Sequence, residues 1–287
     1  MDNKLKAILS TLSYADIFDY PLTKEEIFLY LISIQKFSKQ DIYPFLSEKN
    51  GYFERKKEFY FLKGRGEIIE KRIRRKKESI KKLNIARKIV RKISFVPTVK
   101  FIGISGALAM QNCEKEDDID LFVITEKNSV WATRLLLVLL LRISGIYRSR
   151  GDKNVSNKIC LNFLIDSGQI DFSKKSDIFT AHEIVQIIPV FSRNSGFRDF
   201  VKANSWTKKF LPNTSVKYIR EEKDKFYNPL FKFFLLKSEK TARFIQYGYM
   251  KKHITKEKVS QNLLAFHPFD YRQYVLKEYR NKLKKLI

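Results

Sequence analysis

Two apolar runs separated by a short polar segment constrain the fold of this chain most strongly. They lie in the sequence FIGISGALAMQNCEKEDDIDLFVIT, residues 101–125. The first run predicts a buried strand that ends in a tight turn of small residues, and the second run predicts another strand. The ten residues between Ala107 and Asp118 are enough for one short helix. The segment therefore predicts two adjacent strands joined by a turn and a helix.

The alternation of helix and strand continues beyond residue 125. SVWATRLLLVLLLRISGIYR predicts a buried helix, NKICLNFLID a third strand, and DIFTAHEIVQIIPVF a further helix that ends near Pro189. Strands separated by helices indicate an α/β (α+β) core, which we place at residues 96–200.

Two aspartates, Asp118 and Asp120, open the second predicted strand. Residues i and i+2 of a strand point to the same face, so the two carboxylates would lie side by side. Two such anions repel each other, and a hard divalent cation such as Mg²⁺ or Mn²⁺ removes the conflict. The alternative is a pair of carboxylates at a strand edge that face water.

The residues just before this pair suit a phosphate group. Ser105, Gly106 and Ala107 form a small-residue turn after an apolar strand. Small residues let a phosphate approach backbone N–H groups, and the positive end of the following helix would point the same way. A phosphate cradle beside metal-binding carboxylates predicts a site for a nucleoside triphosphate (NTP).

The sequence SGALAMQNCEKEDDIDLF resembles the signature of the nucleotidyltransferase superfamily, which has the DNA polymerase beta-like fold. The signature begins with an apolar residue, then Gly, then either Gly or Ser. After a gap of about a dozen residues it ends in Asp-apolar-Asp/Glu-apolar. The resemblance covers roughly residues 95–190. It implies that Asp118 and Asp120 hold one or two Mg²⁺ ions. It also implies that Ser105 and the backbone of Gly106 and Ala107 position the phosphates, while a hydroxyl attacks the α-phosphate and releases pyrophosphate.

The chain departs from this family pattern at two positions. Ala107 stands where the family has Ser. Asn162, in the third predicted strand, stands where active members carry a third carboxylate. An amide is a weak metal ligand and cannot act as a base. Asp166, at the end of the same strand, is an alternative that lies farther along the strand.

Residues 1–66 predict a small helical unit that ends in a hairpin. Thr23 and Glu26 have the spacing of a capping box at the start of a helix, and GYFERKKEFYFL predicts two strands around a charged turn. Three helices followed by a hairpin is the order of a winged helix. This unit looks like the winged helix that is fused to some uncharacterised bacterial members of the superfamily.

Residues 67–95 predict one long basic helix. Residues 71–92 hold twelve basic side chains and one acidic side chain, Glu78, and apolar residues repeat at helical spacing at Ile69, Ile73, Ile80, Leu83 and Val90. The helix is either a linker with a solvated side or a surface that contacts phosphates. Residues 201–287 predict a helical, aromatic and basic region.

The composition indicates a cytoplasmic protein with a polyanionic partner. The formal net charge is +26, and a nucleic acid is the partner that such an excess favours, although a merely lysine-rich surface is the alternative. Two cysteines, Cys113 and Cys160, exclude a disulfide framework. We expect no secretory signal at the N-terminus and no membrane span, because the most apolar run, residues 135–141, is too short.

Three further residues are weaker site candidates. His182 and Glu183 could line the site, and His267 could contact a substrate from the C-terminal region; structural roles are the alternatives. The sequence as a whole predicts a nucleotidyltransferase that moves a nucleotide from Mg·NTP to an acceptor hydroxyl, on a nucleic acid among other possible acceptors. The alternatives are a catalytically degenerate scaffold that binds DNA or RNA, and a toxin-like enzyme that modifies tRNA or a protein.

Overall fold

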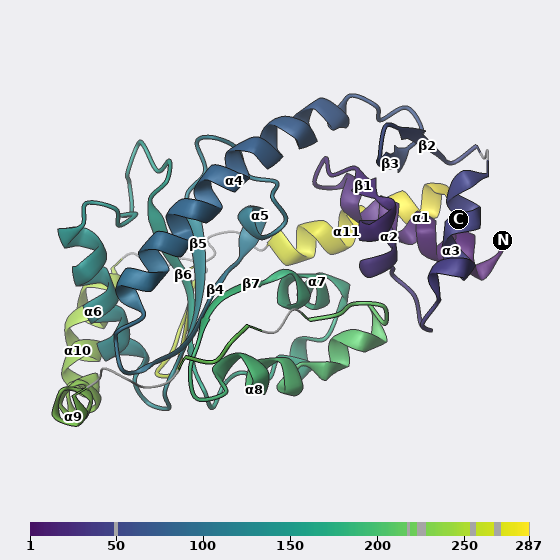
Figure 1. Cartoon of the computed structure of the whole chain (residues 1–287). Helices are drawn as coiled ribbons and strands as arrows, with labels where there is room; N and C mark the ends of the chain where they lie inside the picture. The colour runs from purple at the N-terminus through teal and green to yellow at the C-terminus, as the bar shows by residue number, and fades with distance from the viewer. Residues whose placement is uncertain (49–50, 217–218, 223–227, 253–256, 267–270, 287) are drawn as a thin grey trace.

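The computed structural model describes residues 1–48, 51–216, 219–222, 228–252, 257–266 and 271–286 (Figure 1). The described residues form a mixed α/β structure with two sheets. A small three-stranded sheet belongs to the N-terminal region, and a six-stranded sheet forms the centre of the molecule. Among these residues no helix combines the length and apolar character needed to cross a membrane.

The N-terminal region has the predicted order of three helices and a hairpin. Its elements are α1 Asn3–Asp16, β1 Leu22–Thr23, α2 Lys24–Leu29, α3 Lys39–Ser47, β2 Phe53–Lys56 and β3 Phe59–Leu62. The antiparallel sheet has the order β1-β3-β2, so β1 extends the hairpin. The capping box predicted at Thr23 and Glu26 is confirmed, since each side chain accepts a hydrogen bond from the other residue's backbone N–H. The name winged helix stays a prediction for this unit.

The predicted basic helix is confirmed as α4, Ile68–Ile93, which runs 26 residues from the hairpin across the central sheet (Figure 1). Its apolar face differs in part from the predicted one. Leu83 and Val90 are buried as expected, but Ile73 and Ile80 are 45% and 49% exposed. The helix packs on the sheet through its C-terminal half. The side chains of Ile73 and Ile80, which precede that half, therefore remain partly exposed to solvent.

The central sheet has the strand order β7-β4-β5-β6-β9-β8. Its strands are β4 Val99–Ile104, β5 Ile119–Thr125, β6 Ile159–Asp166, β7 Ile188–Ser192, β8 Lys258–Val259 and β9 Leu263–Ala265. Strands β5 and β6 are parallel, and the other neighbouring pairs are antiparallel. The parallel pair needs a crossover connection, and α6, Val130–Ile143, supplies it. This is the buried helix that the sequence predicted.

The remaining helices pack around this sheet. They are α5 Gly106–Ala109, α7 Ile178–Gln186, α8 Gly196–Ala203, α9 Pro229–Lys237, α10 Glu239–Lys251 and α11 Tyr271–Leu286, with 3-10 turns at Ser173–Lys175 and Ser205–Lys209. Helix α7 ends shortly before Pro189 as predicted, and Pro189 itself lies in the edge strand β7. The C-terminal region is helical as expected, but it also adds β8 and β9 to the sheet.

Helix α11 joins the C-terminal region to the N-terminal one. It lies between α1 and α7 (Figure 1), and its residues Val275 and Tyr279 are buried in a cluster that includes Tyr14 of α1. Lys282 pairs with the buried carboxylate of Asp16. The space enclosed by α1, α7, α11 and the sheet is where the site residues gather.

Candidate metal and nucleotide site

The sheet brings the two predicted aspartates together with a cysteine. Asp118 immediately precedes β5, Asp120 is the second residue of that strand, and Cys160 is its partner on the parallel strand β6. One ligand atom from each of these three residues lies within 4.8 Å of the other two. The predicted side-by-side placement of Asp118 and Asp120 is therefore present. The third side chain of the group is Cys160, which the sequence had not indicated.

Burial and mutual repulsion disfavour two charged carboxylates here. Burial, with the charge of Asp118 as a second cause, raises the pKa of Asp120 to about 7. Burial also raises the pKa of Asp118, and the nearby Arg148 guanidinium opposes that rise. Arg148 Nη1 lies 2.9 Å from Asp118 Oδ2. The two side chains form an ion pair, but the geometry of this contact is not that of a hydrogen bond. A bound cation would stabilise both carboxylates in their charged form.

Of the three close side chains, the two carboxylates suit a hard divalent cation and the thiol does not. Carboxylate oxygens are the ligands that Mg²⁺ prefers, and Asp118 Oδ2 is buried without a hydrogen-bond donor among the described residues. Cys160 is a poorer ligand for such an ion because burial raises the pKa of its thiol, which favours the protonated form. Asp118 and Asp120 are thus the residues that would hold Mg²⁺ or Mn²⁺.

Gly106 is required at its position for two independent reasons. Its φ is +64°, in the left-handed region that residues with a side chain rarely adopt. A Cβ atom at this position would lie 2.8 Å from Asp120 Oδ2. The turn that the sequence predicted as a phosphate cradle is therefore packed directly against Asp120, one of the two carboxylates that it predicted as metal ligands.

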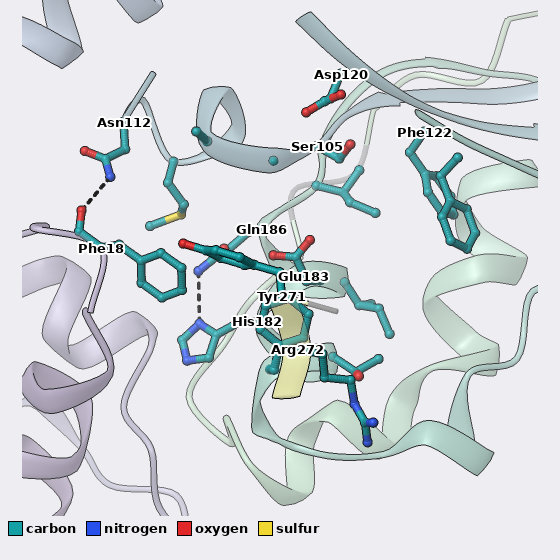
Figure 2. Close-up of a pocket in the computed structure, with 18 of the residues that line it drawn as sticks. Phe18, Ser105, Asn112, Asp120, Phe122, His182, Glu183, Gln186, Tyr271 and Arg272 are labelled. Atoms are coloured by element: carbon teal, nitrogen blue, oxygen red, sulfur yellow. Dashed lines mark hydrogen bonds between the residues drawn. The ribbon is translucent and has the colours of Figure 1, made fainter. Parts of the chain in front are cut away.

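This turn and Asp120 open into one large cavity of about 880 Å³ (Figure 2). Ser105, Gly106, Ala107 and Asp120 all line it. Ten of the other described lining residues are aromatic, and they come from α1, the loops beside α2, the sheet, the loop before the first 3-10 turn, α7, α8 and α11. These aromatic residues are Tyr14, Phe18, Tyr20, Tyr30, Phe122, Phe163, Phe172, Phe179, Phe200 and Tyr271. The cationic residues of the wall are Lys175, Lys258 and Arg272.

Asn162 lies in the cavity wall but outside the group of three close ligands. It follows Cys160 by two residues, so it is on the same face of β6, and it is largely buried. The alternative, Asp166, is fully buried at the end of β6. Its two oxygens accept hydrogen bonds from the backbone N–H groups of Asn128 and Gly168, each at 2.9 Å. Asp166 therefore stabilises a turn and does not line the cavity.

His182 and Glu183 both line the cavity, as the sequence allowed, but they differ in environment. The His182 ring stacks on Tyr14 with ring centroids 4.0 Å apart, and its Nδ1 is 2.9 Å from Gln186 Nε2. Burial lowers the pKa of His182 to about 3, so the ring is neutral. The neighbouring Glu183 lines the cavity with an exposed side chain, and the protein around it raises its pKa above the ordinary value. The third candidate, His267, lies outside the described residues.

The sequence missed the aromatic wall and the three cationic residues of the cavity. Their elements are far apart in the chain: α1 and α2 lie before residue 30, and Tyr271 and Arg272 begin α11. No local spacing relates such residues to the Asp118–Asp120 pair. The described structure thus places the predicted phosphate residues and Asp120 in one cavity, with Asp118 close to Asp120, and only the tertiary fold reveals the outer wall.

Comparison with known proteins leaves the family open. Neither the protein-family models nor the curated proteins yield a match to this chain. Among solved structures, one titled "Crystal structure of the toxin-antitoxin with AMP-PNP" matches over 44% of this chain and 86% of its own chain. The sequence identity is 16% and the TM-score is 0.27. A TM-score this low does not establish a common fold, so function is inferred from the site alone.

Proposed function

We propose that the protein is a nucleotidyltransferase that moves a nucleotide from a metal-bound NTP to an acceptor hydroxyl. One observation carries the proposal: the small-residue turn at Ser105–Ala107 and the carboxylate of Asp120 line the same cavity, with Asp118 beside them. A phosphate cradle and a cation site in contact are what NTP binding requires.

Each residue of the site has a separate task in this proposal. Asp118 and Asp120 would hold Mg²⁺ or Mn²⁺, and the bound cation would neutralise charge on the phosphates. The Ser105 N–H donates to the Asp120 carbonyl oxygen at 3.1 Å, so the phosphate donors would be the Ser105 hydroxyl and the Gly106 and Ala107 amides. These amides lie in the first turn of α5 and have no partner within the helix.

Lys175 and Lys258 are candidates to face the triphosphate. Both line the cavity, and burial lowers the pKa of Lys175, with the charge of Lys258 as a second cause. An anionic group between two such lysines would relieve their repulsion. Arg272, the other cation of the wall, is already paired with Asp177.

A binding protein with a degenerate site is the second candidate function. The ion pair between Arg148 and Asp118 favours it, because a protein cation already compensates one of the two metal carboxylates. Cys160 and Asn162 favour it as well, since neither is the carboxylate that active members of the superfamily carry on this strand. In that case the protein would bind nucleic acid without transferring a nucleotide.

The test is nucleotide transfer with and without the aspartates. The protein is incubated with Mg²⁺ or Mn²⁺, each labelled NTP and pooled RNA, DNA or lysate, alongside the double variant Asp118→Asn/Asp120→Asn. Asp199→Asn, an exposed carboxylate paired with Lys100, is the matched control. We expect transfer by the wild type and the control and none by the double variant. Transfer that persists in the double variant would contradict the proposal, and nucleic-acid binding without transfer would favour the second function.

A further inference from the structure

The strand that should supply a base to the proposed reaction has none. On β6, Cys160 is not among the residues that line the cavity, and the Asn162 amide cannot accept a proton at neutral pH. Asp166 is occupied by two backbone N–H groups away from the cavity. An attacking hydroxyl must nevertheless lose its proton, so the base has to come from another element.

Glu183 of α7 is placed to do this. Among the described residues that line the cavity, Asp120 and Glu183 are the two carboxylates. Figure 2 shows the Glu183 carboxylate on the side of the cavity that faces Ser105 and Asp120. No salt bridge to Glu183 occurs within the described part of the chain.

Helix α7, which carries Glu183, is anchored to its neighbours on α1 and α11. Asp177 caps the helix by accepting the Thr180 N–H at 2.7 Å, and it also pairs with Arg272 at the start of α11. His182 is locked on the other side by its stack on Tyr14 and its hydrogen bond to Gln186. Because its neighbour is fixed against α1, Glu183 is directed toward the cavity.

We infer, on the basis of the proposed function, that Glu183 accepts the proton of the acceptor hydroxyl, and that the cavity admits a small, ring-bearing acceptor. The acceptor oxygen forms a bond to the α-phosphorus, and the bond from the α-phosphorus to the bridging oxygen breaks. The electron pair of that bond leaves with pyrophosphate. The proton moves to the Glu183 carboxylate, which returns it to water after the product leaves.

The wall of the cavity determines the class of acceptor. A volume of about 880 Å³ lies in the range of small-molecule sites. Ten aromatic side chains line it against three cations, of which Arg272 is already neutralised by Asp177. A polynucleotide backbone would bring several phosphates past this apolar wall. A compact molecule with an apolar ring and a free hydroxyl satisfies the wall, with its hydroxyl between Glu183 and the metal carboxylates.

The experiment compares Glu183→Gln with wild type and with Glu78→Gln, a half-buried carboxylate on α4 that pairs with Lys81 and lies outside the cavity wall. Labelled NTP and Mn²⁺ are supplied with three separate acceptor pools: the low-molecular-weight fraction of a lysate, RNA and DNA. We expect label in the small-molecule pool, a fall in kcat of about 10²- to 10⁴-fold in Glu183→Gln, and no fall in Glu78→Gln. The KM for NTP and the binding of Mn²⁺ should stay unchanged in Glu183→Gln, so that the loss is confined to kcat.

The outcomes separate this inference from the proposed function. Transfer by wild type that Glu183→Gln retains in full would overturn the role of Glu183 and leave the proposed function standing. Label found in RNA or DNA, and not in small molecules, would overturn the class of acceptor. Absence of transfer by wild type from every NTP to every pool would overturn both. A parallel loss of Mn²⁺ binding in Glu183→Gln would show that the residue supports the metal site instead.

Discussion

Gly106 links the backbone conformation of the small-residue turn directly to the carboxylate of Asp120. Replacing it with Ala adds a Cβ 2.8 Å from Asp120 Oδ2 at a φ of +64°. The left-handed conformation alone costs roughly 1–2 kcal/mol in a residue with a Cβ, and the contact with Asp120 adds to this. We expect Gly106→Ala to lower the free energy of unfolding by more than that amount and to weaken Mn²⁺ binding, measured by denaturant unfolding and by titration.

Gly64 provides a matched control for this substitution. Its φ is +80°, but a Cβ there would meet nothing within 4 Å. Gly64→Ala should therefore lose only the conformational contribution and keep its affinity for Mn²⁺. Equal losses of stability and of affinity in the two variants would show that the contact between Gly106 and Asp120 has no consequence.

His182 makes stability sensitive to acid. Burial lowers its pKa to about 3 in the folded state, against about 6.5 in an unfolded chain. Between these values the unfolded chain binds the proton and the folded one does not, so the free energy of unfolding falls as pH drops below about 6.5. His182→Phe keeps a ring against Tyr14 and removes the titration. We expect the variant to lose less stability than the wild type between pH 7 and pH 4, by on the order of 2–3 kcal/mol.

Unfolding in denaturant at the two pH values measures this difference directly. The comparison uses the change between pH values within each protein, so any constant effect of losing the Gln186 hydrogen bond cancels. An identical pH dependence in His182→Phe and wild type would mean that the ring is protonated in the folded protein.

The site residues that the sequence predicted are those related by local spacing. Asp118 and Asp120 follow from the two-residue period of a strand, and the turn at Gly106 follows from small residues after an apolar run. Cys160 could be found only once the register of β5 and β6 was known, because it faces Asp120 across the two parallel strands. Glu183 was a weak candidate in the sequence because its distance from Asp120 depends on how α7 packs on the sheet.

At the scale of elements, α4 fastens the N-terminal region to the core. Many of its basic side chains turn inward: Arg75 pairs with Glu114 at 2.7 Å, and Lys82 donates to the carbonyl oxygens of Lys115 and Asp117 at 2.9 and 2.7 Å. These contacts hold the loop that leads into Asp118. The sequence predicted that α4 is either a solvated linker or a phosphate-binding surface. Neither prediction included the structural role that half of the helix has.

Arg72 is also buried and makes several of these inward contacts. Its guanidinium pairs with Glu26 at 2.9 Å, donates to the carbonyl oxygens of Met110 and Gln111, and lies 3.9 Å from the Tyr20 ring centroid. Arg72→Met removes the cation that pairs with Glu26 and one donor to each carbonyl group, while the Tyr20 hydroxyl can still donate to Glu26 or to Met110. We expect the free energy of unfolding to fall by roughly 3–5 kcal/mol, measured by denaturant unfolding.

Arg91, an exposed residue near the end of the same helix, gives the control. Arg91→Met should change stability by roughly 0.5 kcal/mol or less, because exposed substitutions away from special contacts have little effect. If Arg72→Met were as mild as Arg91→Met, the inward contacts of α4 would not be what joins the N-terminal region to the core.

At the scale of the whole molecule, local pattern predicted most elements and tertiary contacts decided the rest. The long runs behind α4, β5, α6 and β6 carry clear periodicity, so these elements were predicted. Strand β7 was not, because Pro189 interrupts its pattern, and an edge strand tolerates proline where a central one does not. Strands β8 and β9 are only two and three residues long, too short to carry a period.

The net charge of +26 predicts association with nucleic acid, and the exposed face of α4 is the surface at which we test it. Four exposed lysines, Lys77, Lys81, Lys88 and Lys92, share one side of α4. They are spaced by four, seven and four residues, which keeps them within one face of a helix. Binding through these side chains would release condensed counterions and would weaken as salt rises.

Changing these four lysines to Gln should reduce the dependence of duplex DNA binding on salt. If each contacts one phosphate, the slope of log K against log salt becomes shallower by about 3–4. The control variant changes Lys237, Lys240, Lys251 and Lys252 to Gln, so it loses the same amount of charge. These four lysines are exposed and lie on or just after α9 and α10. Electrophoretic or anisotropy titrations at several salt concentrations measure the slopes. Equal slopes in the two quadruple variants would mean that total charge governs association, and that the exposed face of α4 is a solvated surface.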